Sequence, residues 1–343
     1  MKGSAKMNTE ERQAFWNALC SAKGNDFQED SRLISAAIAE PRFLFRYRPV
    51  NVSSIDALQT NRLYFSKANY YDDPFDTMIK IDYDLLHEHI LHMFSSGNIY
   101  QQFESMCNVF SIPEEERLAT ERIVRTFSLE EIINNADAFL RNNFQSVLKE
   151  SLWTVCFSEI GDNETMWLKY ADQYKGFCVV YDLDDSEKKL CGKQEKCEKC
   201  IVNTAGVSLY PVYYSDTGYD ATEYARSLAI SMILRQKIPH LAERFIQYLP
   251  AGHWEQERIT LIKSKCHEYD QEWRMILRSQ ANGPIMQEWI PHGVILGLRT
   301  SEQERNIILR SAKIAGIKHF FETYINNSNR LAVREIQIAG IDT

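Results

Sequence analysis

The sequence has no apolar run near the roughly 20 residues that a helix needs to cross a bilayer. Its start, MKGSAKMNTEERQ, lacks the apolar stretch of a secretory signal. Its 8 cysteines are scattered over 343 residues, without the density of a disulfide-rich secreted domain, which indicates a reducing compartment. These absences predict a cytoplasmic protein with no membrane partner.

The sequence also lacks the glycine-rich motifs of common nucleotide-binding and hydrolytic sites. Among its 14 glycines there is no G-x-x-x-x-G-K-[ST] phosphate loop, no Rossmann fingerprint and no G-x-S-x-G nucleophile elbow. An excess of positive charge is absent too, because 39 basic residues face 47 acidic ones and the net charge is −8. The chain as a whole is therefore a poor polyanion binder, whereas a local basic patch is compatible with this total.

The sequence is long enough and apolar enough to form a folded core, because it has 343 residues of which 44% are hydrophobic. Aromatic and β-branched segments predict strands, at 42–48, 62–66, 152–158, 177–183, 207–215, 272–277, 293–298, 319–325 and 331–338. Irregular helical stretches separate these segments, and the regular βαβ alternation of a doubly wound parallel sheet is absent. The sequence therefore predicts the α+β class.

The helical segments predict how the chain divides. Residues 1–40 are predicted to form N-terminal helices, and residues 41–343 a single α+β domain. Within this domain we expect a large helical insertion at about 83–150 and a Cys-containing loop at about 184–206. Residues 219–264 are also predicted to be mostly helical.

An acidic loop, YYDDPFD at 70–76, directly follows the predicted strand 62–66. Earlier in the chain, Arg46 and Arg48 alternate along a predicted strand and so share one face. Pairing between these arginines and the loop carboxylates is the most economical explanation for an acidic loop at this place. The sequence therefore predicts that Asp73 and Asp76 orient the two arginines and have a structural role.

Three segments, in order along the chain, resemble a known family. FLFRYR and the later YYDDPFD are similar to its "YKYR"-like strand and "FNDPFD"-like loop. VCFSEIGDNETMWLKYADQYKGFCVVYDL is similar to its "CFS … MW..YA..H.GIC..F" block, and KCHEYDQEWRMIL to its "K…W..E.EWR" block. The segments together extend from about residue 42 to about residue 298. They resemble a large bacterial family known only as domain of unknown function number twenty-nine seventy-one.

Three positions depart from the patterns of this family. Asp72 stands where the family usually has asparagine, Tyr174 where histidine is frequent, and Tyr269 where tryptophan is frequent. Membership in a family of unknown function does not identify an activity, so these residues have to be interpreted by their own chemistry.

The order of elements also resembles that of the ADP-ribosyltransferases, with a strand, a short helix, a second strand and a late glutamate on a strand. This resemblance implies an ADP-ribosyltransferase-like mixed or antiparallel β core. It implies that Glu272 is the catalytic carboxylate and that Arg46 or Arg48 grips the pyrophosphate of NAD. It further implies that the other cofactor-binding residues are Tyr47, Tyr64, Phe65, Ser66, Trp167 and Arg274.

The chemistry of NAD cleavage needs such a set of residues. Breaking the nicotinamide–ribose bond builds positive charge on the ribose, which a carboxylate stabilises. A guanidinium binds phosphate oxygens bidentately, and aromatic rings provide a dry wall for nicotinamide. The resemblance implies NAD as substrate, an acceptor that is a protein or a nucleic acid, and a role as a bacterial toxin or antiphage defence effector. It predicts that Glu272→Ala abolishes NAD turnover and leaves the melting temperature nearly intact.

Two other function classes use the same residues. Asp73, Asp76 and Glu272 resemble loosely the acidic Mg²⁺ site of restriction-like nucleases. In such a site Arg274 would stand where lysine is wanted, and arginine does not deprotonate. Alternatively, the protein is a non-enzymatic sensing or interaction module in which arginine–carboxylate pairs only stabilise the fold. The sequence leaves the acceptor, the oligomeric state and any activating partner open.

A second candidate site is the segment CGKQEKCEKC at 191–200. Cys197 and Cys200 have the C-x-x-C spacing of two zinc ligands, and Cys191 supplies a third thiol. Neighbouring lysines favour the ionised thiolates that bind metal. A fourth ligand would have to come from elsewhere, such as Cys266 or His267. The alternative is a cysteine-containing loop without a metal.

Overall fold

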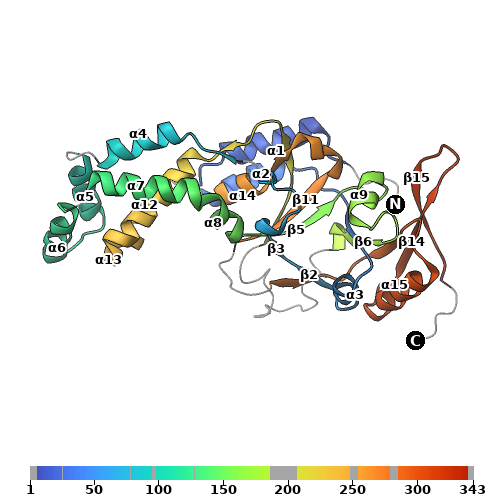
Figure 1. The fold of residues 1–343 in the computed structure, drawn as a ribbon. Helices are drawn as coiled ribbons and strands as arrows, with labels where there is room; N and C mark the ends of the chain where they lie inside the picture. Colours follow the sequence, from blue (N-terminus) through green and yellow to red (C-terminus); the bar gives the residue numbers. More distant parts are fainter. Residues whose placement is uncertain are drawn as a thin grey trace.

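The fold is described from a computed structural model of the chain (Figure 1). The structure describes residues 6–24, 26–77, 79–94, 98–126, 128–185, 207–247, 254–278 and 285–338. The predicted zinc ligands Cys191, Cys197 and Cys200 lie outside these residues. No helix in the described ranges combines the length and the apolar character needed to cross a membrane.

A mixed open sheet forms the body of the protein, with the strand order β15-β14-β13-β6-β1-β5-β11-β7 and with β3 also paired to β5. Its strands are β1 (Phe43–Arg48), β3 (Ser66–Lys67), β5 (Leu152–Ser158), β6 (Phe177–Asp182), β7 (Val207–Pro211), β11 (Glu272–Arg278), β13 (Gly293–Leu296), β14 (His319–Ile325) and β15 (Leu331–Glu335). The neighbours β13 and β14 run parallel, and the other pairs of this sheet are antiparallel. A mixed sheet combined with separate helical regions agrees with the predicted α+β class.

Among the described residues, three short strand pairs lie outside this sheet. They are β10 (Ile262–Ser264) with β8 (Tyr213–Ser215), β12 (Met286–Glu288) with β2 (Arg62–Tyr64), and β4 (Ile79–Lys80) with β9 (Tyr219–Asp220). Helices α12 (Thr222–Lys237), α13 (Pro239–Ile246) and α14 (Glu255–Thr260) confirm the prediction of a mostly helical segment over 219–264, and only its last residues form strand β10. A strand of three residues is too short to produce a recognisable alternation in the sequence.

One edge of β5 is shared by two strands that diverge from each other. Near the end of β5, Ser158 pairs with Phe45 of β1, and near its start Thr154 pairs with Ser66 of β3. Between these contacts, no strand in the described part of the chain pairs with residues 155–157 on this edge. The opposite edge of β5 pairs with β11 along its whole length. The sheet therefore forks at β5.

Helices of two chain segments form a lobe that extends to one side of the sheet (Figure 1). The first segment contains α4 (Tyr83–Phe94), α5 (Asn98–Val109), α6 (Glu114–Val124), α7 (Leu129–Asn142) and α8 (Phe144–Ser151), and the second contains α12 (Thr222–Lys237) and α13 (Pro239–Ile246). Leu86, Ile132 and Ile233 are buried in one hydrophobic cluster of this lobe. The first segment occupies the range where the helical insertion is predicted.

The N-terminal helices share the core of the sheet. Phe15 and Leu19 of α1 (Thr9–Ser21) belong to the main hydrophobic cluster, together with Trp273 of β11. Arg12 of α1 is buried and donates hydrogen bonds to the carbonyl oxygens of Val212 (2.7 Å) and of residue 272 (3.1 Å). Helix α1 thereby fixes the backbone at the start of β11.

The remaining α-helices pack around the same sheet. They are α2 (Phe27–Ala36), α3 (Val52–Gln59), α9 (Glu164–Tyr170), α14 (Glu255–Thr260) and α15 (Glu302–Ile314). Short 3-10 turns are η1 (Ala68–Tyr70), η2 (Leu183–Asp185) and η3 (Lys265–Asp270). The turn η3 leads directly into β11.

Candidate functional site

A pocket of about 230 Å³ lies where β1 and β3 diverge from β5. Its walls come from β1, β3, β5 and β11, from β10 and η3, and from the acidic loop that follows β3. The lining residues are Phe45, Arg46, Tyr47, Arg48, Ser66, Tyr70, Tyr71, Asp72, Asp73, Asp76, Thr154, Cys156, Phe157, Ser158, Met166, Tyr170, Lys263, Asp270 and Glu272. The fork therefore brings residues from the front and the last third of the chain to one cavity.

Five charged residues form what we call the acid–cation cluster: Asp76, Asp270, Glu272, Lys263 and Arg274. The Nζ atom of Lys263 lies 2.7 Å from Asp270 Oδ2 and 2.8 Å from Glu272 Oε2. It also lies 3.7 Å from Asp76 Oδ2. The guanidinium of Arg274 contacts Glu272 Oε1 at 2.7 Å and Asp76 Oδ2 at 2.6 Å. Three buried carboxylates thus share two buried cations.

The local sequence explains how these side chains converge. Glu272 and Arg274 are two residues apart on β11 and therefore point to the same face. Gln271 has a left-handed backbone (φ 44°), which interrupts the alternation so that Asp270 also approaches Lys263. Because β10 carries Lys263 as part of a separate small sheet, only the tertiary fold brings this ammonium to the carboxylates.

The pKa values of the two acids Asp270, on η3, and Glu272, on β11, are shifted in opposite directions. Burial opposes ionisation of Glu272, but Arg274 and Lys263 outweigh it and hold the pKa of this carboxyl well below its usual range. For Asp270 burial is the stronger effect, and its pKa is raised although Lys263 opposes the shift. Burial also opposes the charge of Lys263, but Glu272 and Asp76 raise its pKa above the ordinary value. Glu272 is accordingly a carboxylate at neutral pH.

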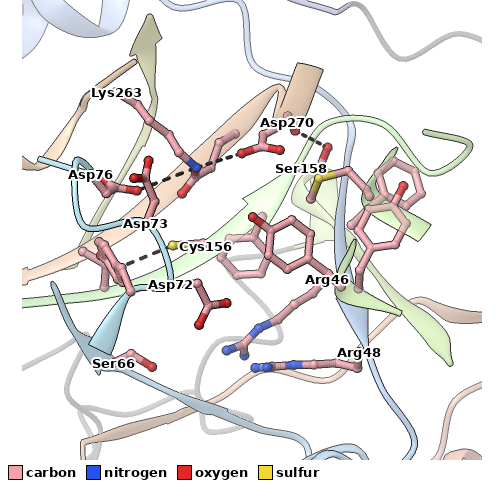
Figure 2. A pocket seen from close by; sticks show the side chains of 18 of the residues that line it. Arg46, Arg48, Ser66, Asp72, Asp73, Asp76, Cys156, Ser158, Lys263 and Asp270 are labelled. Carbon is pink, nitrogen blue, oxygen red and sulfur yellow. Dashed lines mark hydrogen bonds and ion pairs between the residues drawn. The ribbon is translucent and has the colours of Figure 1, made fainter. Parts of the chain in front are cut away.

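The other end of the pocket contains two arginines, Arg46 and Arg48, which we call the arginine pair. Both side chains are partly buried, and in Figure 2 their guanidinium groups lie close together, away from Lys263 and Asp270. Arg46 donates to the carbonyl oxygen of Tyr64 at 3.5 Å. Within the described ranges, no carboxylate forms an ion pair with either arginine.

The pKa shifts of the arginine pair have the direction expected for cations without counter-ions. Burial and the positive charge of Arg48 lower the pKa of Arg46 to about 9. Burial also lowers the pKa of Arg48. Arg46 stays cationic at neutral pH, because this value remains above 7. Two guanidiniums that face one cavity form a site for an anion, with the planar geometry that suits phosphate.

The acidic loop does not bind these arginines as predicted. Asp76 binds Arg274 and Lys263, and Asp73 Oδ2 lies 3.1 Å from Nε2 of His267. The loop carboxylates do have structural partners, but the partners come from β10, η3 and β11 instead of β1. The reason is the fork, which separates β1 from β3 and directs the loop toward the wall that β11 forms.

Several residues predicted to bind the cofactor lie outside the lining of the pocket. Trp167 is fully buried, donates to the carbonyl oxygen of Gly161 at 3.0 Å and packs edge-on against Tyr47. Phe65 belongs to the main core. Tyr64 contributes its carbonyl oxygen to Arg46, as described above. Arg274 does not line the pocket, but it forms an ion pair with Glu272, which does.

Of the predicted residues, Arg46, Tyr47, Arg48, Ser66 and Glu272 do line the pocket. The hydroxyl of Tyr47 donates to the carbonyl oxygen of residue 160 at 2.5 Å, which fixes this side chain beside the arginine pair. The two predicted arginines and the predicted glutamate therefore line the same pocket.

Two charged residues of the pocket, Lys263 and Asp270, were not predicted from the sequence. Lys263 lay in a segment predicted to be helical and carried no signal of its own. Asp270 did carry a signal, because it precedes the E-W-R motif by two residues, a spacing that can add another carboxylate to the same site. A third lining residue, Cys156, has a pKa raised to about 12 by burial and by Glu272, so its thiol is neutral and not a nucleophile.

The comparisons with known proteins give one match. Residues 166–275 match a family described as "Protein of unknown function (DUF2971)". This match confirms the resemblance to this family that the sequence predicts, over residues 166–275 of the chain. The matched residues include Lys263, Asp270 and Glu272, whereas the arginine pair and the acidic loop precede them. No curated protein and no solved structure matches the chain.

Proposed function

We propose that the pocket binds NAD and that the protein is an ADP-ribosyltransferase-like enzyme. The observation that carries this proposal is the arginine pair, which has no carboxylate partner among the described residues and faces the cavity that Glu272 also lines. A buried cation without a counter-ion is costly, so its presence beside a cavity favours an anionic ligand. NAD combines such an anion, the pyrophosphate, with a ribose on which a carboxylate can act.

The residues of the pocket divide the task as follows. Arg46 and Arg48 bind the pyrophosphate oxygens, and aromatic side chains such as Tyr71 and Tyr170 provide the wall for the rings. Glu272 accepts a hydrogen bond from the 2′-hydroxyl of the ribose and stabilises the positive charge that develops when nicotinamide leaves. Its lowered pKa keeps it ionised for this role.

The alternative of a Mg²⁺-dependent nuclease finds less support. The Nζ atom of Lys263 lies among the carboxylates of Asp76, Asp270 and Glu272, at the place that a divalent cation would occupy. No group of three His, Cys, Asp or Glu side chains in the described ranges is arranged to hold a metal ion. The carboxylates are therefore neutralised by the protein itself.

The acceptor of the ADP-ribose and the biological role belong to the same proposal. The resemblance described above favours a macromolecular acceptor, a protein or a nucleic acid. It also favours a role as a bacterial toxin or antiphage effector.

Measurement of nicotinamide release from NAD tests the proposed function. We expect release by the wild-type protein and a loss of at least about 100-fold for Glu272→Gln, which keeps the size of the side chain and removes its charge. The exposed Asp216→Asn, outside the pocket lining, is the matched control and should keep the wild-type rate. Absence of turnover, combined with Mg²⁺-dependent cleavage of DNA or RNA that EDTA abolishes, would contradict the proposal and support the nuclease.

A further inference from the structure

The backbone of Glu272 is bound by two side chains that come from other parts of the chain. Its N–H group donates a hydrogen bond to the hydroxyl oxygen of Tyr214 at 2.7 Å. Its carbonyl oxygen accepts a hydrogen bond from Nη1 of Arg12 at 3.1 Å. Tyr214 lies on β8 and Arg12 on α1, so neither residue belongs to the main sheet. The backbone of this glutamate is therefore held from outside its own sheet.

The place of Glu272 in β11 explains why its backbone needs such contacts. Glu272 is the first residue of this strand, and Gln271 before it has a left-handed backbone (φ 44°). The register pairs between β11 and β7 begin one residue further on. On this edge of the sheet, the backbone bond to the carbonyl oxygen of Glu272 comes from the N–H group of Val212, at 2.9 Å. Because the ends of strands open locally more easily than their centres, the first residue of β11 depends on side-chain contacts for a fixed position.

The guanidinium of Arg12 is itself fixed on several sides. The residue is 2% exposed, and its Nη1 atom also donates to the carbonyl oxygen of Val212 at 2.7 Å. Its Nη2 atom lies 3.2 Å from Oε1 of Glu159, as a buried ion pair, and Glu159 directly follows β5. The guanidinium carbon also lies 5.5 Å from the centre of the Tyr214 ring. One planar cation thus connects α1 with the end of β5, the segment between β7 and β8, and the start of β11.

The contacts to the backbone of Glu272 complement those to its side chain. Its two carboxylate oxygens accept hydrogen bonds from Lys263 and Arg274. These two cations orient the carboxylate, whereas Arg12 and Tyr214 fix the backbone from which the side chain extends. A catalytic group has to be held within about 0.5 Å of its productive position, and a misplacement of about 1 Å can lower a rate by about 100-fold. Contacts to this backbone therefore affect the rate of a reaction as well as the stability of the fold.

We infer that Arg12 and Tyr214 are positioning residues for Glu272 and that helix α1 is required for the activity of the site. The inference rests on the proposed function. Neither side chain is among the described residues that line the pocket, so both act through the backbone of Glu272. Helix α1 also contacts η3, because the hydroxyl of Thr9 donates to Oε1 of Glu268 at 2.9 Å. Nicotinamide release is therefore expected to depend on a helix that lies outside the family match over residues 166–275.

Removal of one hydroxyl group from the full-length protein tests the inference. Tyr214→Phe removes only the acceptor of the hydrogen bond from the N–H group of residue 272. It should lower kcat for nicotinamide release about 10- to 100-fold and leave KM for NAD nearly unchanged, because the arginine pair is intact. Tyr213→Phe is the matched control, since the Tyr213 hydroxyl donates to Oε1 of Gln13 at 2.7 Å instead of binding residue 272. This control loses the same group from the same strand and should keep the wild-type kcat.

Substitutions of Arg12 give a second readout. Arg12→Met removes the charged donor to the carbonyl oxygen of residue 272 and should lower kcat about 100-fold. Arg12→Lys keeps one charged donor and should recover at least about tenfold of this loss, again with nearly unchanged KM. Each variant is assayed below its own melting temperature, so that kcat refers to folded protein. If Arg12→Met does not fold, which its melting curve would reveal, the comparison of Tyr214→Phe with Tyr213→Phe decides the question.

A purely structural role of Tyr214 makes a different prediction. Tyr214→Phe would then melt at a lower temperature but keep the wild-type kcat below it, and this result would overturn the inference. An equal fall in kcat for Tyr213→Phe would overturn it too, because the effect would not depend on the backbone of residue 272. Both results leave the proposed function standing, since the wild-type protein still releases nicotinamide. If the wild-type protein releases none, the proposed function fails and the inference fails with it.

Discussion

The two charged ends of the pocket differ in how the protein compensates their charge. In the acid–cation cluster, every charged side chain has a partner of opposite sign within 2.8 Å. In the arginine pair, two cations lie together without a carboxylate partner among the described residues. The fold therefore provides its own counter-ions at one end of the pocket, whereas the described residues provide no carboxylate partner at the other end.

This difference has an energetic basis. Buried ion pairs are expensive to desolvate, and removing one partner leaves an uncompensated charge that costs more than the pair contributed. The acid–cation cluster therefore contributes to the stability of the fold and also lines one end of the pocket. In the arginine pair, burial and the positive charge of Arg48 lower the pKa of Arg46, and burial lowers the pKa of Arg48.

The largest effect is expected on the free energy of unfolding, when variants at the two charged ends of the pocket are compared. Arg274→Met should lower the free energy of unfolding by about 3–5 kcal/mol, because it leaves Asp76 and Glu272 with too little positive charge. Arg46→Met should not lower it, since no ion pair is lost and the unfavourable burial of this charge beside Arg48 is relieved. Urea denaturation of both variants measures the contrast. Equal losses would show that the arginine pair is as structural as the cluster.

A smaller effect is expected on NAD binding. Arg46→Met and Arg48→Met should each weaken binding by about 1.5–3 kcal/mol, or roughly 10- to 150-fold, the value of a hydrogen bond to a charged group. Arg42→Met is the matched control, because Arg42 lies just before β1, is 57% exposed and does not line the pocket. Isothermal titration calorimetry measures the affinities. A loss for Arg42→Met as large as for Arg46→Met would indicate a general charge effect.

The smallest effect is expected in the pH dependence of stability. The folded pKa of Glu272 is lowered from the ordinary value of 4.5, so its ionisation contributes stability above that value. This contribution is lost as the pH falls through the lower folded pKa. The raised pKa of Asp270 acts in the opposite direction and offsets part of the loss. The stability difference between wild type and Glu272→Gln should therefore narrow as the pH falls from 6 to 3, and a widening difference would contradict this assignment.

The sequence predicted those parts of the site that depend on local alternation. Arg46 and Arg48 share a face of β1, and Glu272 and Arg274 share a face of β11, because residues two apart on a strand point the same way. The partners of the acidic loop were not predicted, since they depend on which strand lies opposite. The fork at β5 is likewise a property of long-range pairing and has no sequence pattern.

The structure also changes the expectation for Glu272→Ala. A nearly unchanged melting temperature was predicted on the assumption that Glu272 acts only on the ligand. Because this carboxylate binds both Lys263 and Arg274, its truncation leaves two buried cations with fewer partners. Glu272→Gln is therefore the better variant for separating activity from stability.

The most direct test of the account is a crystal structure of Glu272→Gln soaked with NAD. The account predicts that the pyrophosphate lies against Arg46 and Arg48 and that the nicotinamide ribose lies beside residue 272 and Asp270. NAD bound elsewhere on the protein, or in the pocket with its phosphates away from both arginines, would contradict it.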